Sequence, residues 1–490
     1  MSNNPISEYD EIVYRNLQQH IYQNLKKLCN DKTPQFNFRP LKWLWEHFWS
    51  SGRFLYQECP TVDNFEKDLL PEQIQNLTQD QIELFYKIYL RYIREHNVAN
   101  PNNYVFDINT YAQLEEKRNK GQLITHAIGS HSYVHGGLLN KSFTEYEGRI
   151  SNNKATSAEL LDFIQEIGLT PSCIDIRSEK DNSEQCKSET EEEEKEKEID
   201  KIINCGIDTI DKVFSRKDKC ALEKATRLYN DKNHTLLANS IKSGENIFVS
   251  PTESFVMLFN SVAQSQEVWI KGSNYTISKL LGLNNTNIKN NSDFFPTTNL
   301  DCTTIINRLI ISHYHRYTVP TNCTVNGILV LGNKFYSVQP TLIKSKTADL
   351  YTENRRVVLF VENAGFGKFA IVIVGATATS SIKLTNPELD AAMNTFYNKK
   401  PINDYSVHTI KDYKKDILDL RDKKIKLNIL DFTNEPTELG QFHFGGSTLV
   451  TIIPHKTGPN THILNKYIKM ASDQGVEVKV DIGVPLVYAP

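Results

Sequence analysis

One short stretch near the carboxyl end of the chain combines a nucleophile with a sharp backbone bend. Gly445 and Gly446 let the backbone turn where a β-branched residue could not, and Ser447 follows at the bend. If the Ser447 hydroxyl attacks the carbonyl of Gly446, the peptide bond becomes an ester. Elimination from that ester then converts the serine into a pyruvoyl group, an electron sink for amino-acid decarboxylation. The alternative interpretation is an ordinary glycine turn before a strand.

Three histidines are candidates for moving the protons that this chemistry requires. A serine hydroxyl is a poor nucleophile until a base within hydrogen-bond distance takes its proton. His443 lies four residues before Ser447, and His313 and His315 flank Tyr314. The alternative for each is a structural histidine that is held by hydrogen bonds.

Another histidine pair, His131 and His135, has the i, i+4 spacing with which two imidazoles on a helix share a metal. Gly136 and Gly137 follow, and this favours a loop, so we predict no metal site. The eight cysteines form no CxxC motif. We therefore predict free thiols and a reducing, cytoplasmic compartment.

Composition limits the fold and the partners. A chain of 490 residues exceeds one ordinary core, so two domains and a linker are expected. Its 56 basic and 59 acidic residues nearly cancel, which argues against a nucleic-acid partner. The amino terminus is neither basic nor apolar, and the longest apolar run, Phe369 to Ala376, is far shorter than the ~20 residues of a membrane helix. We expect at most peripheral contact with a membrane.

The first part of the chain has the pattern of helices. Thr156 with Glu159 forms a capping box ahead of an apolar-periodic segment that Gly168 ends. The cluster Trp43–Trp49 has the composition of a helical core, with a membrane-surface anchor as the alternative. We predict a helical domain over residues 1–175.

A charge run, Ser178–Asp200, follows and predicts a solvated linker or an exposed helix, which we place at residues 176–204. Beyond residue 245 the pattern changes to strands, with Asn363–Gly367 as a hairpin turn and Lys424–Leu430 as a half-buried strand. Other candidate strands are Ile247–Val249, Glu267–Ile270, Gly327–Val338, Arg356–Val361, Phe369–Val374, Thr448–Ile453 and Val476–Val480. The predicted fold class is α+β, with a helical N-terminal domain and a β-rich domain over residues 205–490.

Several segments of this second domain, in order, resemble the phosphatidylserine decarboxylase family, whose pyruvoyl-dependent members cleave themselves at a Gly-Ser bond. These segments are Gly206–Arg216, Ser250–Glu253, Lys271–Gly282, Tyr314–Pro320, Glu353–Arg356, Val374–Thr377 and Phe444–Thr448. Within the family, the chain is most similar to the branch of the fungal tryptophan decarboxylase, which has a helical N-terminal extension. Glu253 and the string Phe442-His-Phe-Gly-Gly-Ser447 carry that closer resemblance.

The resemblance implies roles for single residues. Cleavage between Gly446 and Ser447 would make the pyruvoyl group from Ser447, and His315 matches a histidine that is implicated in decarboxylation. A second family histidine is replaced by Thr318, which cannot act as a base near neutral pH. We therefore expect His443 or His315 to assist Ser447, with support from Glu253 in place of the family's aspartate.

The implied activity is decarboxylation of the phosphatidylserine headgroup or of a free amino acid, with aromatic amino acids among the candidates. The branch resemblance and the absence of an apolar span favour the free amino acid. The alternative is a non-cleaving homologue that binds a ligand or regulates, because Thr318 interrupts the family's motif and a fold does not guarantee its activity. An oligomer is compatible with the sequence.

Overall fold

A computed structural model provides the fold, and it describes the chain in segments. The described residues are 4–15, 78–80, 83, 86–87, 90, 105–106, 153–175, 195–261, 263–265, 276–283, 291–296, 301–310, 312–335, 350–376, 382–397, 416–443, 447–455 and 462–490. The Trp43–Trp49 cluster, the pair His131 and His135, the predicted strand Glu267–Ile270, and Gly446 lie outside them.

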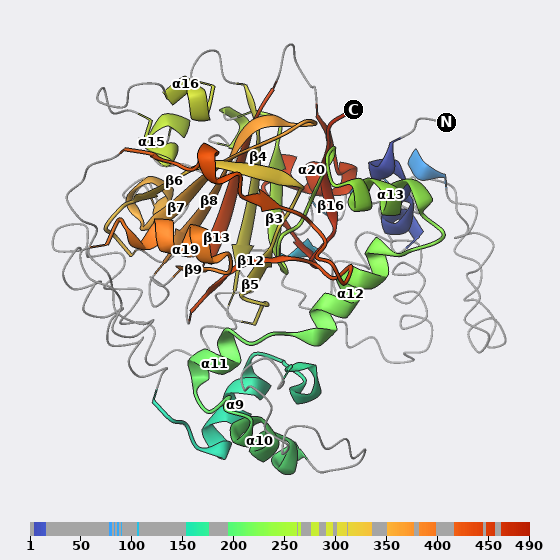
Figure 1. The fold of residues 1–490 in the computed structure, drawn as a ribbon. Helices are drawn as coiled ribbons and strands as arrows, with labels where there is room; N and C mark the ends of the chain where they lie inside the picture. Colours follow the sequence, from blue (N-terminus) through green and yellow to red (C-terminus); the bar gives the residue numbers. More distant parts are fainter. Residues whose placement is uncertain are drawn as a thin grey trace, which may run out of the picture.

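A ten-stranded antiparallel sheet forms the centre of the molecule (Figure 1). Its strands are, in spatial order, β1 (Val105–Phe106), β15 (Glu477–Val480), β3 (Ser254–Phe259), β4 (Cys302–Leu309), β13 (Ser447–Pro454), β8 (Gly367–Gly375), β7 (Arg356–Asn363), β6 (Cys323–Leu331) and β10 (Leu418–Asp419), with β11 (Lys426–Leu427) also paired to β6. Every residue of β3, β4 and β13 is buried. Side chains alternate between the two faces of a strand, so each face packs its own core: Leu449 belongs to one apolar cluster and Val450 to the other.

Two small sheets flank the large one. The first contains β5 (Arg316–Thr318), β12 (Glu438–Phe442) and β9 (Ile382–Leu384), with β12 in the middle. The second contains β14 (Ile463–Leu464), β16 (Pro485–Tyr488) and β2 (Ile247–Val249). The first small sheet matters for function because its strands begin or end next to His315 and His443.

Helices surround the sheets and form a separate group below them in Figure 1. The named helices are α9 (Ser157–Glu166), η1 (Pro171–Cys173), α10 (Lys195–Asn204), α11 (Ile210–Phe214), α12 (Lys219–Tyr229), α13 (Thr235–Ser243), α15 (Ile277–Leu281), α16 (Asn291–Phe294), α18 (Leu350–Glu353), α19 (Pro387–Asn394), η4 (Arg421–Lys423) and α20 (Lys466–Asp473). Residues 5–15 are also helical. Among the described residues, no helix has the length and apolar character needed to cross a membrane.

The separate group consists of α9, η1, α10 and α11, which share an apolar core of their own. The capping box of Thr156 and Glu159 is confirmed at the start of α9, and Gly168 follows the helix with a φ of 68°. Of the two alternatives predicted for the charge run, a solvated linker or an exposed helix, its end forms a helix that is partly buried. Its last residues begin α10, whose Ile199 and Ile202 are buried in this core.

The described residues before position 107 do not form a unit with α9 and η1 but pack against the rest of the chain. The Glu8 carboxylate accepts hydrogen bonds from the first backbone amides of α13, and Tyr86 packs edge-on against Tyr467. Strand β1 adds an edge to the large sheet through β15. A self-contained helical domain over 1–175 is therefore not confirmed, and its boundary stays a prediction.

Candidate active site

Ser447 is the first residue of β13, in the interior of the large sheet. It pairs with Leu309 of β4 on one side and Gly375 of β8 on the other. Its side chain is fully buried, and its Oγ lies 3.3 Å from Nδ1 of His315. The structure thus brings the predicted nucleophile and one predicted base, 132 residues apart in sequence, within hydrogen-bond distance.

Hydrogen bonding orients the His315 ring. Its Nε2 lies 2.9 Å from the carbonyl oxygen of Ile310, which only accepts, so Nε2 carries the proton. The Nδ1 lone pair then faces Ser447. Phe214 stacks on the ring with centroids 3.7 Å apart. Burial lowers the pKa of His315 well below its ordinary value of 6.5, so the imidazole is neutral and able to accept a proton.

His443 follows the last residue of β12. The backbone amide of Phe442 donates to the carbonyl of His315 at 3.0 Å, so the end of β12 lies beside His315. The Nδ1 of His443 lies 2.9 Å from Oδ2 of Asp211, and both side chains are buried. His443 follows β12 whereas Ser447 begins β13, and residues 444–446 between them are outside the described part of the chain.

Glu253 contacts the site through the backbone. Its Oε2 accepts a hydrogen bond from the amide of Tyr314 at 3.3 Å, and its Oε1 lies 2.8 Å from Nζ of Lys479. Neither bond involves a histidine. Glu253 therefore holds the segment that leads into His315, and the role of orienting the base directly stays a prediction.

Thr318 and His313 have structural partners. The amide and the hydroxyl of Thr318 both donate to the carbonyl of Pro251, at 2.7 and 3.0 Å. His313 is buried against Phe255, and its Nδ1 accepts from the amide of Ile310 at 3.3 Å. Thr318 thus joins the end of β5 to the backbone at Pro251.

Comparison with known proteins gives the family of this part of the chain. Residues 236–478 match the sequence profile of the phosphatidylserine decarboxylase family. This segment belongs to that family.

Similar curated proteins carry the same family name. Phosphatidylserine decarboxylase proenzyme 2 of Saccharomyces cerevisiae is 26% identical over 244 residues, which are 50% of this chain and 17% of that protein. Proenzyme 2 of Oryza sativa subsp. japonica is 33% identical over 146 residues, 30% of this chain and 22% of the relative. The proenzyme of Clostridium tetani is 26% identical over 250 residues, 50% of this chain and 64% of the relative. The chain thus spans less than two thirds of the length of these relatives.

Sequence reasoning missed the residues that a short segment before the phosphatidylserine decarboxylase domain contributes to the site. Helix α11 supplies Asp211 to His443 and Phe214 to His315. The carbonyl of Ser215, just after the helix, accepts from Nε of Arg316 at 2.8 Å. The family resemblance covered this segment. No local pattern, however, indicates that the carboxylate of Asp211 contacts His443, which is 232 residues away in the sequence.

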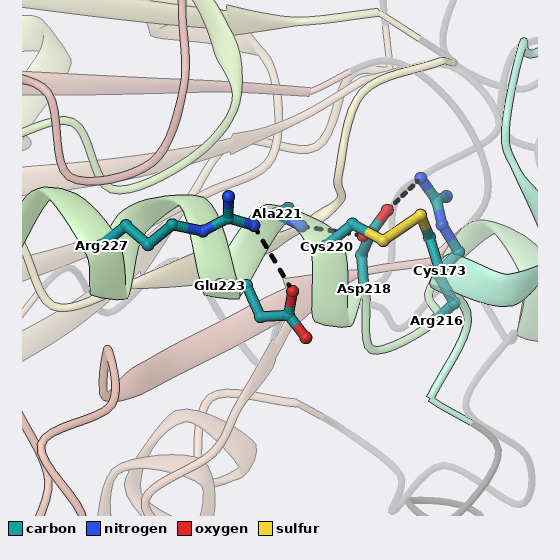
Figure 2. Close-up of a disulfide and its surroundings, with 7 residues drawn as sticks. All are labelled: Cys173, Arg216, Asp218, Cys220, Ala221, Glu223 and Arg227. Atoms are coloured by element: carbon teal, nitrogen blue, oxygen red, sulfur yellow. Dashed lines mark hydrogen bonds and ion pairs between the residues drawn. A yellow bond between two sulfur atoms is a disulfide. The ribbon is translucent and has the colours of Figure 1, made fainter.

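A disulfide links the helical group to α12, the helix that follows this segment. Figure 2 shows Cys173, at the end of η1, bonded to Cys220 near the start of α12. Beside it, Arg216 pairs with Asp218, which caps α12 through the amide of Ala221. The prediction of free thiols is therefore wrong here, and Cys205 is also disulfide-bonded. Disulfides are typical of oxidising compartments, so cysteine usage does not support a cytoplasmic location.

Proposed function

We propose that the protein is a pyruvoyl-dependent decarboxylase that makes its own cofactor from Ser447. The observation that carries this proposal is the 3.3 Å distance between Ser447 Oγ and the Nδ1 lone pair of His315. A neutral imidazole in this position is what a serine nucleophile needs. The word "proenzyme" in the names of the relatives supports a precursor that is processed.

His315 has the position to serve both parts of the first step. Its Nδ1 takes the Oγ proton as Oγ bonds to the carbonyl carbon of Gly446. It then returns the proton to the nitrogen of Ser447 as the peptide C–N bond breaks, so the peptide becomes an ester without net proton change. Both side chains are buried, which limits competing attack by water.

The same histidine also suits the decarboxylation. The pyruvoyl group, when present, supplies the electron sink for loss of carbon dioxide. His315 lies beside residue 447, so it can deliver a proton to the carbon that the departing carbon dioxide leaves. This use of His315 agrees with the family resemblance.

Self-cleavage is the direct test. Denaturing electrophoresis and mass spectrometry of the purified protein should show fragments 1–446 and 447–490. Ser447→Ala should give one full-length chain. His315→Gln should also block cleavage, whereas His455→Gln, which changes a buried histidine bonded to Thr303, should not. A wild-type chain that stays intact after long incubation would overturn the proposal in favour of a non-cleaving, ligand-binding homologue.

For the substrate, we propose the serine headgroup of phosphatidylserine, because the matched relatives carry that lipid in their names. The expectation of a free amino acid rests on the branch resemblance and on the absence of an apolar span in the sequence. The assay compares carbon dioxide release from phosphatidylserine vesicles with release from tryptophan, phenylalanine, tyrosine and serine, with Ser447→Ala as the blank. Turnover confined to a free amino acid would overturn the lipid assignment.

A further inference from the structure

Two buried histidines lie at the candidate site, and their partners differ. His315 donates from Nε2 to a backbone carbonyl, whereas Nδ1 of His443 lies 2.9 Å from the carboxylate of Asp211. A carboxylate stabilises an imidazolium much more than a carbonyl does, because it carries a full negative charge. Asp211 can therefore offset the positive charge of an imidazolium that forms at His443 during a reaction.

Both histidines belong to one neighbourhood around Ser447. His315 contacts Ser447 through Nδ1, and its carbonyl accepts from the amide of Phe442, the residue before His443. The end of β12, which His443 follows, and Ser447 therefore both lie beside His315. Since Nδ1 of His443 is bonded to Asp211, Nε2 is the nitrogen that can accept a proton.

The conversion of Ser447 has two stages that make different demands on a base. In the ester-forming stage the proton of Oγ passes to the nitrogen of the same residue, so the base is only a carrier. In the elimination stage a base removes the Cα proton of Ser447 and keeps it. The Cα–Cβ double bond forms, the Cβ–Oγ bond breaks, and the carboxylate of Gly446 leaves; water then releases the nitrogen as ammonia and completes the pyruvoyl group.

We propose that His443, oriented by Asp211, is the base that removes the Cα proton of Ser447 in the elimination stage. This inference rests on the proposed self-cleavage and divides it between two histidines, His315 for the ester and His443 for the elimination. Asp211 is a positioning residue that acts through His443. Its location on α11 explains why this short helix lies against the site.

The experiment separates the two stages. Hydroxylamine cleaves esters, so it splits a chain that has stopped at the ester and leaves Ser447 with its nitrogen at the new amino terminus. Asp211→Asn keeps the shape but removes the charge. We expect it to accumulate the hydroxylamine-sensitive ester and to form the pyruvoyl fragment about 100-fold more slowly, the lower end of what general acid–base catalysis contributes.

Matched variants show whether the slower elimination is specific to the pair of Asp211 and His443, called the dyad below. Asp208→Asn changes a nearby acid whose carboxylate pairs with Lys212 instead, and it should process at the wild-type rate. Asp211→Glu should restore part of the rate. His443→Gln, which keeps a hydrogen-bond donor for Asp211, should also stop at the ester. If thermal unfolding shows that Asp211→Asn is not folded, His443→Gln takes its place in the test.

Each contrary result has a distinct meaning. A folded Asp211→Asn that forms the pyruvoyl fragment at the wild-type rate overturns the inference. A folded variant that neither forms ester nor cleaves also overturns it, because the dyad would then act before the elimination. A wild-type chain that never cleaves would instead overturn the proposed function, so the two failures are distinguishable.

Discussion

At the scale of single residues, burial keeps His313 and His315 neutral, and His315 lies next to Ser447. Desolvation lowers the pKa of both His313 and His315 well below 6.5 in the folded protein. In the unfolded chain both histidines take up protons near pH 6.5, so below that pH the unfolded state binds more protons than the folded state. Stability from these two groups is therefore present above pH 6.5 and is lost as the pH falls.

This predicts a pH dependence that His315→Gln should reduce. In the Ser447→Ala background, the free energy of unfolding in urea should fall between about pH 6.5 and pH 5, by up to about 1.4 kcal/mol per pH unit for each histidine. Asp10, whose pKa burial raises to about 7, has the opposite dependence, so the informative quantity is the difference between the two proteins. Equal slopes with and without His315→Gln would contradict the prediction.

At the scale of elements, α11 is a five-residue helix that carries Asp211 and Phe214 into the site. A helix of this length is unstable alone, so α11 depends on its amino-terminal cap and on the packing of its buried side chains. The Thr209 hydroxyl accepts from the amide of Lys212 at 3.2 Å. Thr209→Ala should lower the free energy of unfolding by about 1 kcal/mol and slow self-cleavage, measured by urea unfolding and by the rate at which fragment 447–490 appears.

Helix α9 provides the matched control for this element. Thr156 caps it in the same way, through the amide of Glu159 at 3.3 Å, but α9 contributes no residue to the site described above. Thr156→Ala should therefore cost a similar free energy and leave the cleavage rate unchanged. Equal slowing in both variants would show that cleavage responds to stability in general.

At the scale of the whole molecule, a disulfide connects η1 of the helical group to α12, just beyond the residues that α11 contributes to the site. The Cys173–Cys220 disulfide closes a loop with a sequence separation of 47. Replacing both cysteines by serine should lower the free energy of unfolding by about 2–4 kcal/mol, because the open chain gains conformational freedom when unfolded. Urea unfolding of the Ser447→Ala protein with and without these changes measures the effect.

Thiol labelling checks the same bond without mutation. When the denatured, unreduced protein is alkylated, Cys302 and Cys323 should react, whereas Cys173, Cys205 and Cys220 should not. Reduction before alkylation should add the missing labels. Labelling of Cys173 and Cys220 without reduction would mean that the purified protein lacks the disulfide.

Features that depend on near neighbours could be predicted from the sequence. The capping box of α9, its glycine stop and the hairpin at Asn363–Gly367 all follow from residues within a few positions of one another, and the structure contains each of them. The strand predicted over Gly327–Val338 was too long, since β6 ends before Gly332, where a φ of 76° turns the chain. Strand β3 was missed. Strand β4 was also missed, because its buried Asn307 and Arg308 interrupt the apolar pattern, and their partners Ser254 and Glu477 are distant in sequence.

The candidate site shows the same difference between what near neighbours determine and what distant contacts determine. The sequence by itself singled out Ser447 and a short list of histidines, because a glycine-flanked serine and titratable side chains are visible as residue types. Only the tertiary structure decided that His315 faces Ser447 and that Asp211 faces His443, across 132 and 232 residues of chain. Such contacts form when strands pair and side chains pack in the core. Their geometry depends on many interactions between distant residues, so it leaves no local pattern in the sequence.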